Sequence, residues 1–170
     1  MEEIINHGEL LTKEESQRFF EEINQSITWL KIINLGEKTA FFSFYGSKDF
    51  TIPSLFSEQK ALPWTEELLA LKQLIEIYTN QRFNACVIIA QSKNKPFSMK
   101  LQSILENLEE ESSIAFINLK NSVEISLNHH TSSIQNRQLI EHPITFNQNE
   151  TIKIKGTNNH FTLIYFKIKS

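Results

Sequence analysis

The sequence predicts an α+β fold in which two helices precede many strands, arranged as a sheet sandwich or an open barrel. Helical patterns of apolar residues begin after Thr12 and after Thr65, whereas the other segments show the period-two or continuous apolar patterns of strands. Helices followed by a run of strands are typical of this class. With 170 residues and a hydrophobic fraction of 40%, the chain is expected to form one domain, 1–170, around a real core.

Both predicted helices have clear starting signals. Thr12 and Glu15 form a capping box, so the first helix is expected to begin at Lys13. Thr65 is the predicted N-cap of the second helix. The residues expected to face the core are Phe19, Phe20, Ile23 and Ile27 in the first helix and Leu68, Leu71, Leu74, Ile75 and Tyr78 in the second.

The rest of the chain is predicted to consist of strands and loops. Residues 86–90 form a continuous apolar run, which indicates a strand buried on both faces. Other strands are expected at 29–35, 41–52, 114–119, 123–127, 143–146, 151–155 and 161–169. Loops are expected at 53–63, 92–98 and 129–138, and residues 99–111 show the apolar spacing of a helix.

Composition excludes several classes of protein. The net charge of -3 and the pI of about 6.0 give no overall attraction to nucleic acid or to an anionic membrane. The single cysteine, Cys86, excludes an internal disulfide and fits a reducing compartment. The acidic N-terminus is followed by no apolar run, and no segment approaches membrane-spanning length. We therefore expect an intracellular protein, cytoplasmic or nuclear, without a membrane partner.

Several short motifs occur in a recognisable order. They are Phe44-Tyr45-Gly46, Leu62-Pro63-Trp64-Thr65-Glu66, Arg82-Phe83-Asn84-Ala85, Ser113-Ile114-Ala115 and Ile117-Asn118-Leu119, preceded by a helix and a tryptophan within 11–29. In order and spacing they resemble the AlkB family of iron(II)/2-oxoglutarate dioxygenases, with no gap from Phe83 to Leu119. The resemblance implies a double-stranded β-helix core, jelly-roll or cupin-like, with two N-terminal helices packed on the sheet.

The same resemblance implies a metal site whose residues are missing here. In the family, a His-x-Asp pair and a later His hold the iron. This chain has Leu101 and Ser103 at the His-x-Asp positions, and its only aspartate is Asp49. An aliphatic side chain and a neutral hydroxyl cannot hold iron(II) between them. The loop that should carry the later His, after Gly156, is also missing.

The positions that hold 2-oxoglutarate in the family are changed as well. The family has an Asn, a Tyr and two Arg, whereas the corresponding residues here are Ile89, Gln91, Phe161 and Lys167, the last two by approximate alignment. Thr39-Ala40 stands where the substrate-recognition region has Pro-Arg. We therefore expect no cofactor, neither iron(II) nor 2-oxoglutarate, and a pseudoenzyme rather than an enzyme.

The histidines and the cysteine suggest no replacement site. His7-Gly8-Glu9 is the only His-x-acid motif, and it lies before the first helix, far from the expected cleft. The side chains of the adjacent His129 and His130 should point apart, and His142 and His160 are isolated, so packed or solvated roles are expected. Cys86 lies in a buried strand and is expected to be inert. Spatial proximity is not visible in a sequence, so a metal site built from several histidines remains an alternative.

Lysines alternate with apolar residues near the C-terminus. The spacing places Lys153 and Lys155 on one face of their strand, and Tyr165, Lys167 and Lys169 on one face of theirs. Because Lys167 falls near a carboxylate-binding position of the family, this set is expected to face the former cleft, with Lys93, Lys95 and Lys100 at its entrance. Such a groove would bind single- or double-stranded nucleic acid or another anion. The alternative is a solvated face with edge-protecting lysines.

Three functions are consistent with these observations. The leading hypothesis is a catalytically inactive, nucleic-acid-related binding module in which Phe42, Phe44 and Tyr45, if exposed, stack on bases, although alternation should bury at least one of the phenylalanines. The second is a protein-interaction or regulatory scaffold, which an exposed apolar patch would favour. The third is a residual 2-oxoglutarate-dependent nucleic-acid demethylase with a rebuilt site, which needs two His and a carboxylate near Leu101.

Overall fold

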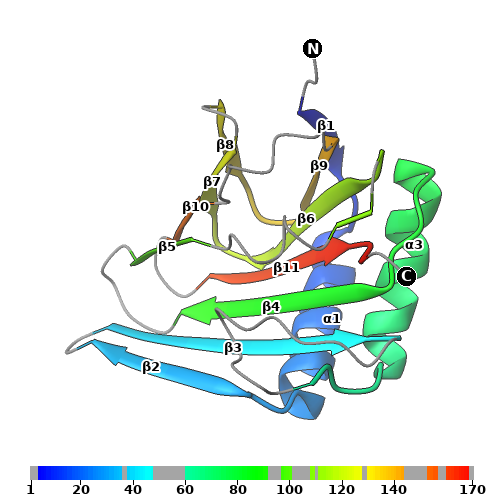
Figure 1. Ribbon diagram of the computed structural model, residues 1–170. Coiled ribbons are helices and arrows are strands. Elements are labelled where there is room, and N and C mark those ends of the chain that lie inside the picture. The colour runs from blue at the N-terminus through cyan, green and yellow to red at the C-terminus, as the bar shows by residue number, and fades with distance from the viewer. Residues whose placement is uncertain are drawn as a thin grey trace.

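The computed structural model describes residues 4–35, 38–47, 60–91, 97–100, 108–109, 111–127, 130–143, 153–156 and 160–168 (Figure 1). Its helices are α1 (Lys13–Ser26) and α3 (Glu66–Thr79). Its strands are β1 (Ile5–Glu9), β2 (Lys31–Leu35), β3 (Lys38–Gly46), β4 (Ala85–Gln91), β5 (Phe97–Lys100), β6 (Ser113–Lys120), β7 (Val123–Leu127), β8 (His130–Ile134), β9 (Gln138–Pro143), β10 (Lys153–Gly156) and β11 (Phe161–Phe166). No helix in these ranges is both long and apolar enough to cross a membrane.

The strands form two antiparallel sheets, a major and a minor one. The major sheet has seven strands in the order β1-β9-β6-β11-β4-β3-β2, and the minor sheet has four in the order β5-β10-β7-β8. In Figure 1 both helices lie behind the major sheet, and the minor sheet lies apart from them. Neighbours in each sheet are seldom consecutive in sequence, so most strand pairs join distant parts of the chain.

Helix α1 begins as the capping box predicts. The Glu15 backbone N–H donates to Thr12 Oγ1 at 3.1 Å, and the Thr12 backbone N–H donates to Glu15 Oε1 at 3.0 Å. This exchange satisfies two backbone donors at the helix start and lowers the pKa of Glu15. Phe19 and Ile23 are buried against the major sheet, as their spacing predicts.

Helix α3 also begins where it is predicted. Thr65 Oγ1 accepts the Leu68 backbone N–H at 3.2 Å, and Asn80 ends the helix in the left-handed conformation. Leu68, Leu71 and Ile75 are buried, but Tyr78 is 50% exposed and Leu74 only half-buried. The predicted apolar face is therefore too wide, because the helix buries a narrow stripe and turns one side toward solvent.

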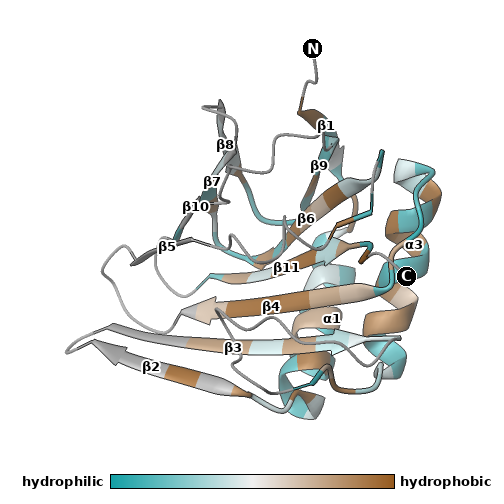
Figure 2. Ribbon diagram, viewed as in Figure 1, coloured by the Kyte–Doolittle hydropathy of each residue, from teal (hydrophilic) through white to brown (hydrophobic). Residues whose placement is uncertain are grey.

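The central strands are apolar on both faces because both faces are covered. β4, β6 and β11 carry hydrophobic residues along most of their length (Figure 2). On one face, residues of the major sheet pack against Val123, Ile125 and Ile134 of the minor sheet in what we call the inner cluster. On the other face, Phe19, Ile23, Leu68, Leu71 and Ile75 of the helices complete a second cluster.

Four strands were not expected from the sequence: β9 shares only Pro143 with the strand expected at 143–146, and the other three lie at the edges of the sheets. β5 forms within a predicted loop and helix, because Phe97–Lys100 pairs along its whole length with β10. β8 lies in the predicted loop at 129–138, where Thr131, Ser132 and Ser133 carry no apolar signal. β1 includes the His7-Gly8-Glu9 motif and pairs with β9 around an irregularity at which Gly8 has a φ of +77°. Polar edge strands lack the hydrophobic period on which strand prediction depends.

Candidate functional site

One row of paired residues shows how the space between the two sheets, the interior, is lined. Ile89 on β4 pairs with Phe42 on β3 and with Thr162 on β11. Thr162 pairs in turn with Asn118 on β6. Directly paired residues share one face of a sheet. Because Phe42 and Ile89 belong to the inner cluster, the whole row faces the minor sheet.

Apolar side chains fill most of the described interior. Ile89, at the position where the resemblance implies a 2-oxoglutarate-binding Asn, is 1% exposed and packs in the inner cluster. Ile164 and Phe166 are the β11 residues of that cluster, and both are fully buried. Such a lining gives neither oxygen nor nitrogen ligands to iron(II) and no donor to a carboxylate.

A buried polar network interrupts this apolar lining at one end. Thr162 Oγ1 donates to Asn118 Oδ1 at 3.2 Å, and His160 Nδ1 lies 2.9 Å from Thr162 Oγ1. The Asn118 side-chain amide donates to the backbone oxygens of Asn121 and Ile134. His160, Thr162 and Asn118 are each at most 2% exposed. The network thus satisfies polar groups that burial would otherwise penalise, and it ties β6 and β11 to the end of β8.

The direction of these hydrogen bonds fixes the tautomer of His160. Thr162 has one hydroxyl proton and donates it to Asn118, so its oxygen accepts from His160 Nδ1–H. The lone pair of the neutral imidazole is therefore on Nε2. Burial lowers the pKa of His160 to about 4, which keeps the ring neutral and a poor base at physiological pH. One neutral imidazole beside a hydroxyl and an amide is not a metal site.

The residues aligned with the family's arginines do not line the interior. Phe161 is buried in the helix-facing cluster, because it lies on the face of β11 opposite Thr162. Lys167 lies beyond the end of β11, where its Nζ is 3.4 Å from Glu109 Oε2. Both side chains of this ion pair are more than a third exposed, at 38% and 42%. Lys167 is therefore partly neutralised at the surface rather than free to bind an anionic ligand.

Lys155 lies where the solvated-face interpretation of the C-terminal lysines places it, and not in the former cleft. Lys155 pairs with Glu124, and both side chains are exposed. The next pair along the strands is Ile154 with Ile125, and Ile125 is 3% exposed within the inner cluster. Since successive residues of a strand point to opposite faces, Lys155 lies on the outer face of the minor sheet beside a carboxylate.

The aromatic residues proposed to stack on bases are also buried. Phe42 and Phe44 have no exposed surface, and Tyr45 is 2% exposed. Phe42 and Phe44 belong to the inner cluster, while Tyr45 lies on the helix side, where its hydroxyl accepts the Thr28 backbone N–H at 3.0 Å. Base stacking requires an open ring face, so the exposure on which that hypothesis depended is not found, whereas the expected burial of at least one phenylalanine is.

Several predicted site residues lie outside the described part of the chain. These are Leu101, Ser103, Lys93, Lys95, Lys169 and His129. For Gln91, Lys100, Lys153 and His130 the structure describes the strand position but not the side chain. Among described residues, no group of three His, Cys, Asp or Glu side chains is placed to hold a metal ion. The convergence that a rebuilt oxygenase site needs is therefore not found within these ranges.

The other described histidines have structural partners. His7 Nε2 lies 2.9 Å from Glu141 Oε1, and Ser113 Oγ donates to Glu141 Oε2 at 2.7 Å. Glu141 is 5% exposed, so these bonds satisfy a carboxylate that is almost buried between β1 and β6. Glu9, the acid of the His-x-acid motif, instead forms an ion pair with Arg137 at 3.1 Å. His142 is buried, and its Nδ1 lies 2.8 Å from the Pro143 backbone oxygen.

The Phe-Asn motif has a structural role. The Asn84 side chain makes two hydrogen bonds with the Ile168 backbone, one to the oxygen at 3.1 Å and one from the N–H at 2.8 Å. The Phe83 backbone N–H donates to Glu76 Oε2 at 2.9 Å, and Lys72 Nζ lies 3.2 Å from the same carboxylate oxygen. These bonds fix the start of β4 against α3 and against the chain that follows β11.

Cys86 lies in a buried strand, as the apolar run around it predicts. It lies on the helix-facing side of β4, opposite Tyr165 in the β4–β11 register, and is fully buried. Burial raises the pKa of the thiol far above its usual value, so the nucleophilic thiolate is not formed at physiological pH. The Tyr165 hydroxyl donates to the Leu68 backbone oxygen at 2.9 Å and is equally inaccessible.

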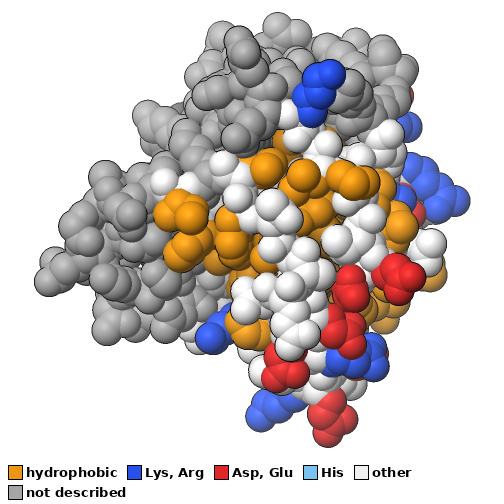
Figure 3. All heavy atoms as spheres, turned by 90° about the horizontal axis from the view of Figure 1, so that it is seen from below, with side chains coloured by type: hydrophobic (Ala, Val, Ile, Leu, Met, Phe, Trp, Pro, Cys, Tyr) orange, Lys and Arg blue, Asp and Glu red, His pale blue; other side chains and the backbone are white. Residues whose placement is uncertain are grey.

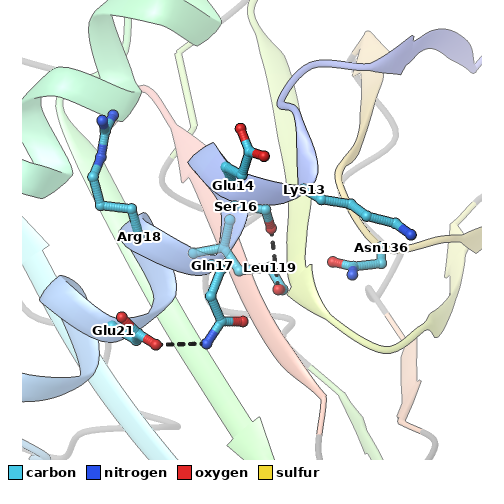
Figure 4. Close-up of a pocket in the computed structure, with 8 residues that line it drawn as sticks. All are labelled: Lys13, Glu14, Ser16, Gln17, Arg18, Glu21, Leu119 and Asn136. Atoms are coloured by element: carbon cyan, nitrogen blue, oxygen red, sulfur yellow. Dashed lines mark hydrogen bonds between the residues drawn. The ribbon is translucent and has the colours of Figure 1, made fainter.

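A shallow depression of about 570 Å³ lies over the first turns of α1 (Figure 4). Its charged lining residues are Lys13, Glu14, Arg18 and Glu21, so the two signs balance. Figure 4 shows Lys13 and Arg18 pointing in opposite directions, away from any common point. Ser16 donates to the Leu119 backbone oxygen at 3.2 Å, and the Gln17 amide donates to Glu21 at 2.7 Å. The depression therefore has the character of a helix surface rather than of a ligand site.

The feature that sequence reasoning missed is an exposed apolar surface beside β2. We call this surface, formed by Ile32 together with Phe20, Trp29 and Phe41, the β2 edge. Ile32 is 54% exposed, and the three aromatic side chains are half-buried. Figure 3 looks onto this side of the molecule and shows hydrophobic side chains gathered at its centre, with acidic and basic side chains to one side. The sequence does contain a signal for this surface, because Trp29 and Phe41 are large aromatic residues at the first positions of two predicted strands.

Comparisons with known proteins identify the fold. No family model matches the sequence, and no curated protein matches it either. A prolyl-4-hydroxylase from Pseudomonas putida superposes with a TM-score of 0.55 at 8% identity, over 100% of this chain and 95% of that one. A prolyl hydroxylase from Trichoplax adhaerens, in complex with a peptide fragment of the hypoxia-inducible factor oxygen degradation domain, superposes with a TM-score of 0.54 at 9% identity, over 96% of this chain and 83% of that one.

Both of these neighbours are prolyl hydroxylases and neither is an AlkB protein, so the comparison supports the kind of fold that the motifs indicated but not the AlkB family. At such low identity the likeness concerns the fold and not the activity. The chain has a mostly antiparallel β structure with two described helices and a fold similar to that of the 2-oxoglutarate oxygenases.

Proposed function

We propose that this chain is a non-catalytic binding domain with a double-stranded β-helix core, a degenerate form of the AlkB-like oxygenase architecture, and that its ligand is a protein segment. The loss of catalysis is supported by two independent features. Ile89 replaces a polar cosubstrate ligand inside an apolar cluster, and Leu101 and Ser103 replace two iron ligands in the sequence.

The observation that carries the choice of a protein ligand is the β2 edge. Exposed apolar patches mark protein-interaction sites more often than nucleic-acid sites, which need positive charge along a groove. The described lysines do not form such a groove, because Lys167 is paired with Glu109 and Lys155 lies beside Glu124 on an outer face. The peptide complex of the Trichoplax hydroxylase adds support, because a domain of similar fold binds a peptide fragment of another protein.

Nucleic-acid binding remains the second candidate because of one observation. Lys100 and Lys153 are direct partners in the β5–β10 ladder. Like charges directly opposite one another weaken a pair of strands unless an anion neutralises them. A phosphate backbone bound along this ladder would supply that anion.

Fluorescence anisotropy separates the two candidates. Labelled single- and double-stranded DNA and RNA are titrated with the protein across a salt series, and a displayed library of random peptides is selected against the same protein. The proposal predicts peptide binders and no salt-sensitive nucleic-acid binding. Nucleic-acid binding that weakens steeply with salt, and that Lys153→Glu abolishes, would establish the second candidate instead.

A further inference from the structure

Helix α3 exposes apolar side chains, whereas helix α1 exposes only polar ones. Both helices lie behind the major sheet (Figure 1). The exposed residues of α1 are Lys13, Glu14, Gln17, Arg18, Glu21, Glu22, Asn24, Gln25 and Ser26. The exposed residues of α3 are Glu66, Ala70, Gln73, Ile77 and Tyr78. The outer side of α1 therefore suits water, while that of α3 has the apolar character of a surface that is covered by a partner.

The exposed residues of α3 lie along one line of the helix. Glu66, Ala70, Gln73 and Ile77 follow one another at intervals of four, three and four residues, which places them one above the other. Ile77 is 77% exposed. The half-buried Leu69 and Leu74 lie on either side of the line. We call the following six residues the outer stripe: Leu69, Ala70, Gln73, Leu74, Ile77 and Tyr78.

Opposite charges lie at the two ends of the outer stripe. Glu66 and Glu67 form the first turn of α3. Arg82 follows the end of the helix, and its side chain is 82% exposed, with one guanidinium nitrogen 3.7 Å from Glu76 Oε1. In an antiparallel pair of α3 helices, the acidic end of each lies beside the arginine end of the other, and the two helix dipoles also attract. A parallel pair would instead bring like charges together.

The sizes of the side chains fit the same antiparallel arrangement. When a two-fold axis passes beside Gln73 and Leu74, Ala70 of each copy lies opposite Ile77 of the other. The most exposed isoleucine thus faces the smallest side chain of the outer stripe, which leaves room for it between the helices. The outer stripe is therefore complementary to itself in both charge and shape.

We propose that the protein forms a two-fold symmetric dimer in which the outer stripes of two antiparallel α3 helices pack together. The contact covers Ile77 and Tyr78, and it brings Glu66 of each copy close to Arg82 of the other. Because α3 has 14 residues and such a helix is about 21 Å long, the interface is small, and the dimer forms at micromolar rather than nanomolar concentrations. This inference goes beyond the proposed function and is independent of it, since the β2 edge includes no residue of α3.

The test is sedimentation of the wild-type protein and its variants over a concentration series from about 1 to 300 µM. Ile77→Asp places a carboxylate at the centre of the contact. Ile5→Asp is the matched control, because Ile5 is an exposed isoleucine on β1. Circular dichroism and urea unfolding verify that each variant folds, which is expected because both isoleucines are exposed.

The expected result is that the wild-type protein and Ile5→Asp dimerise with the same dissociation constant, whereas Ile77→Asp raises this constant about tenfold or more. A wild-type protein that stays monomeric throughout the series overturns the proposal and leaves the outer stripe to a different partner. A dimer that Ile77→Asp does not weaken also overturns it. If Ile32→Asp dissociates such a dimer, the contact lies at the β2 edge instead.

Reversal of the end charges tests the antiparallel arrangement separately. Glu66→Arg and Arg82→Glu should each weaken the dimer about fivefold, because each places like charges side by side. The double variant that carries both substitutions exchanges the two charges and should dimerise about as tightly as the wild-type protein. A double variant that is weaker than either single variant would overturn the antiparallel arrangement, because the charges would then not be partners.

Discussion

Thr162 on β11 donates a hydrogen bond to Asn118 on β6 across 3.2 Å, inside a space whose described lining is mostly apolar. The two residues are direct partners in the β6–β11 ladder, and neither has exposed surface. With His160, they form a network that stabilises the fold through buried hydrogen bonds. The described part of the interior is therefore packed, with apolar contacts and with buried polar groups that hydrogen-bond to one another.

Thr162→Val should destabilise the protein by about 1–3 kcal/mol, because it leaves the Asn118 oxygen and the His160 Nδ1–H without their shared partner. The measurement is the free energy of unfolding in urea. Thr131→Val is the matched control, since Thr131 is exposed on β8 with its hydroxyl 2.8 Å from that of Ser126, and its effect should be about 0.5 kcal/mol or less. Equal effects of the two substitutions would show that the network contributes nothing.

Stability should decrease as the pH is lowered from 7 to 4. The pKa of His160 is lowered to about 4 in the folded protein from 6.5, so between these values the unfolded chain binds more protons. This histidine alone should cost about 3 kcal/mol over that range. The His160→Asn variant should lack this contribution. The decrease in unfolding free energy between pH 7 and pH 4 should therefore be larger for the wild-type protein, and the difference between the two decreases is the contribution of His160. Parallel pH profiles for the two proteins would contradict the assignment.

Ile89→Asn, which restores the polar residue expected from the family resemblance, should destabilise the protein by about 2–4 kcal/mol, because an amide without partners enters the inner cluster. Ile32→Asn makes the same change at a 54% exposed position and should have little effect on unfolding. If Ile89→Asn were instead tolerated and bound 2-oxoglutarate, the interior would retain a latent cosubstrate pocket.

Asn84→Ala should cost about 2 kcal/mol, because both hydrogen bonds to the Ile168 backbone are lost. The same substitution at Asn24, which is exposed on α1, should change the free energy of unfolding by less than about 0.5 kcal/mol. This pair tests whether the Phe-Asn motif that indicated the fold serves structure. A loss of peptide binding without a loss of stability in Asn84→Ala would point to a functional role instead.

Much of the fold could be predicted because its signals are local. The Thr12 and Thr65 caps, the period of Phe19 and Ile23, and the apolar run of β4 each depend on neighbouring residues alone. The edge strands β1, β5 and β8 were missed because their ladders, not their hydrophobic patterns, determine them. Tyr78 was misplaced because spacing shows which residues share a helix face but not how much of that face the sheet covers.

The candidate site was harder to predict because it depends on contacts between distant residues. Alternation predicts that Lys153 and Lys155 share one face of β10, but which face is buried is decided by the pairing of Ile154 with Ile125 on another strand. The network of His160, Thr162 and Asn118 joins residues up to 44 positions apart. The β2 edge was not foreseen, since the exposure of Ile32 depends on where the helices end above the sheet.

The measurement that tests the central claim most directly is a calorimetric titration of the wild-type protein with manganese(II), a stable substitute for iron(II), with and without 2-oxoglutarate. A packed interior and the replaced ligands predict no saturable binding of either and no increase in the melting temperature. Stoichiometric binding of manganese(II) that 2-oxoglutarate strengthens, together with succinate formation when iron(II) is supplied, would show that the domain kept its oxygenase chemistry and would contradict the account.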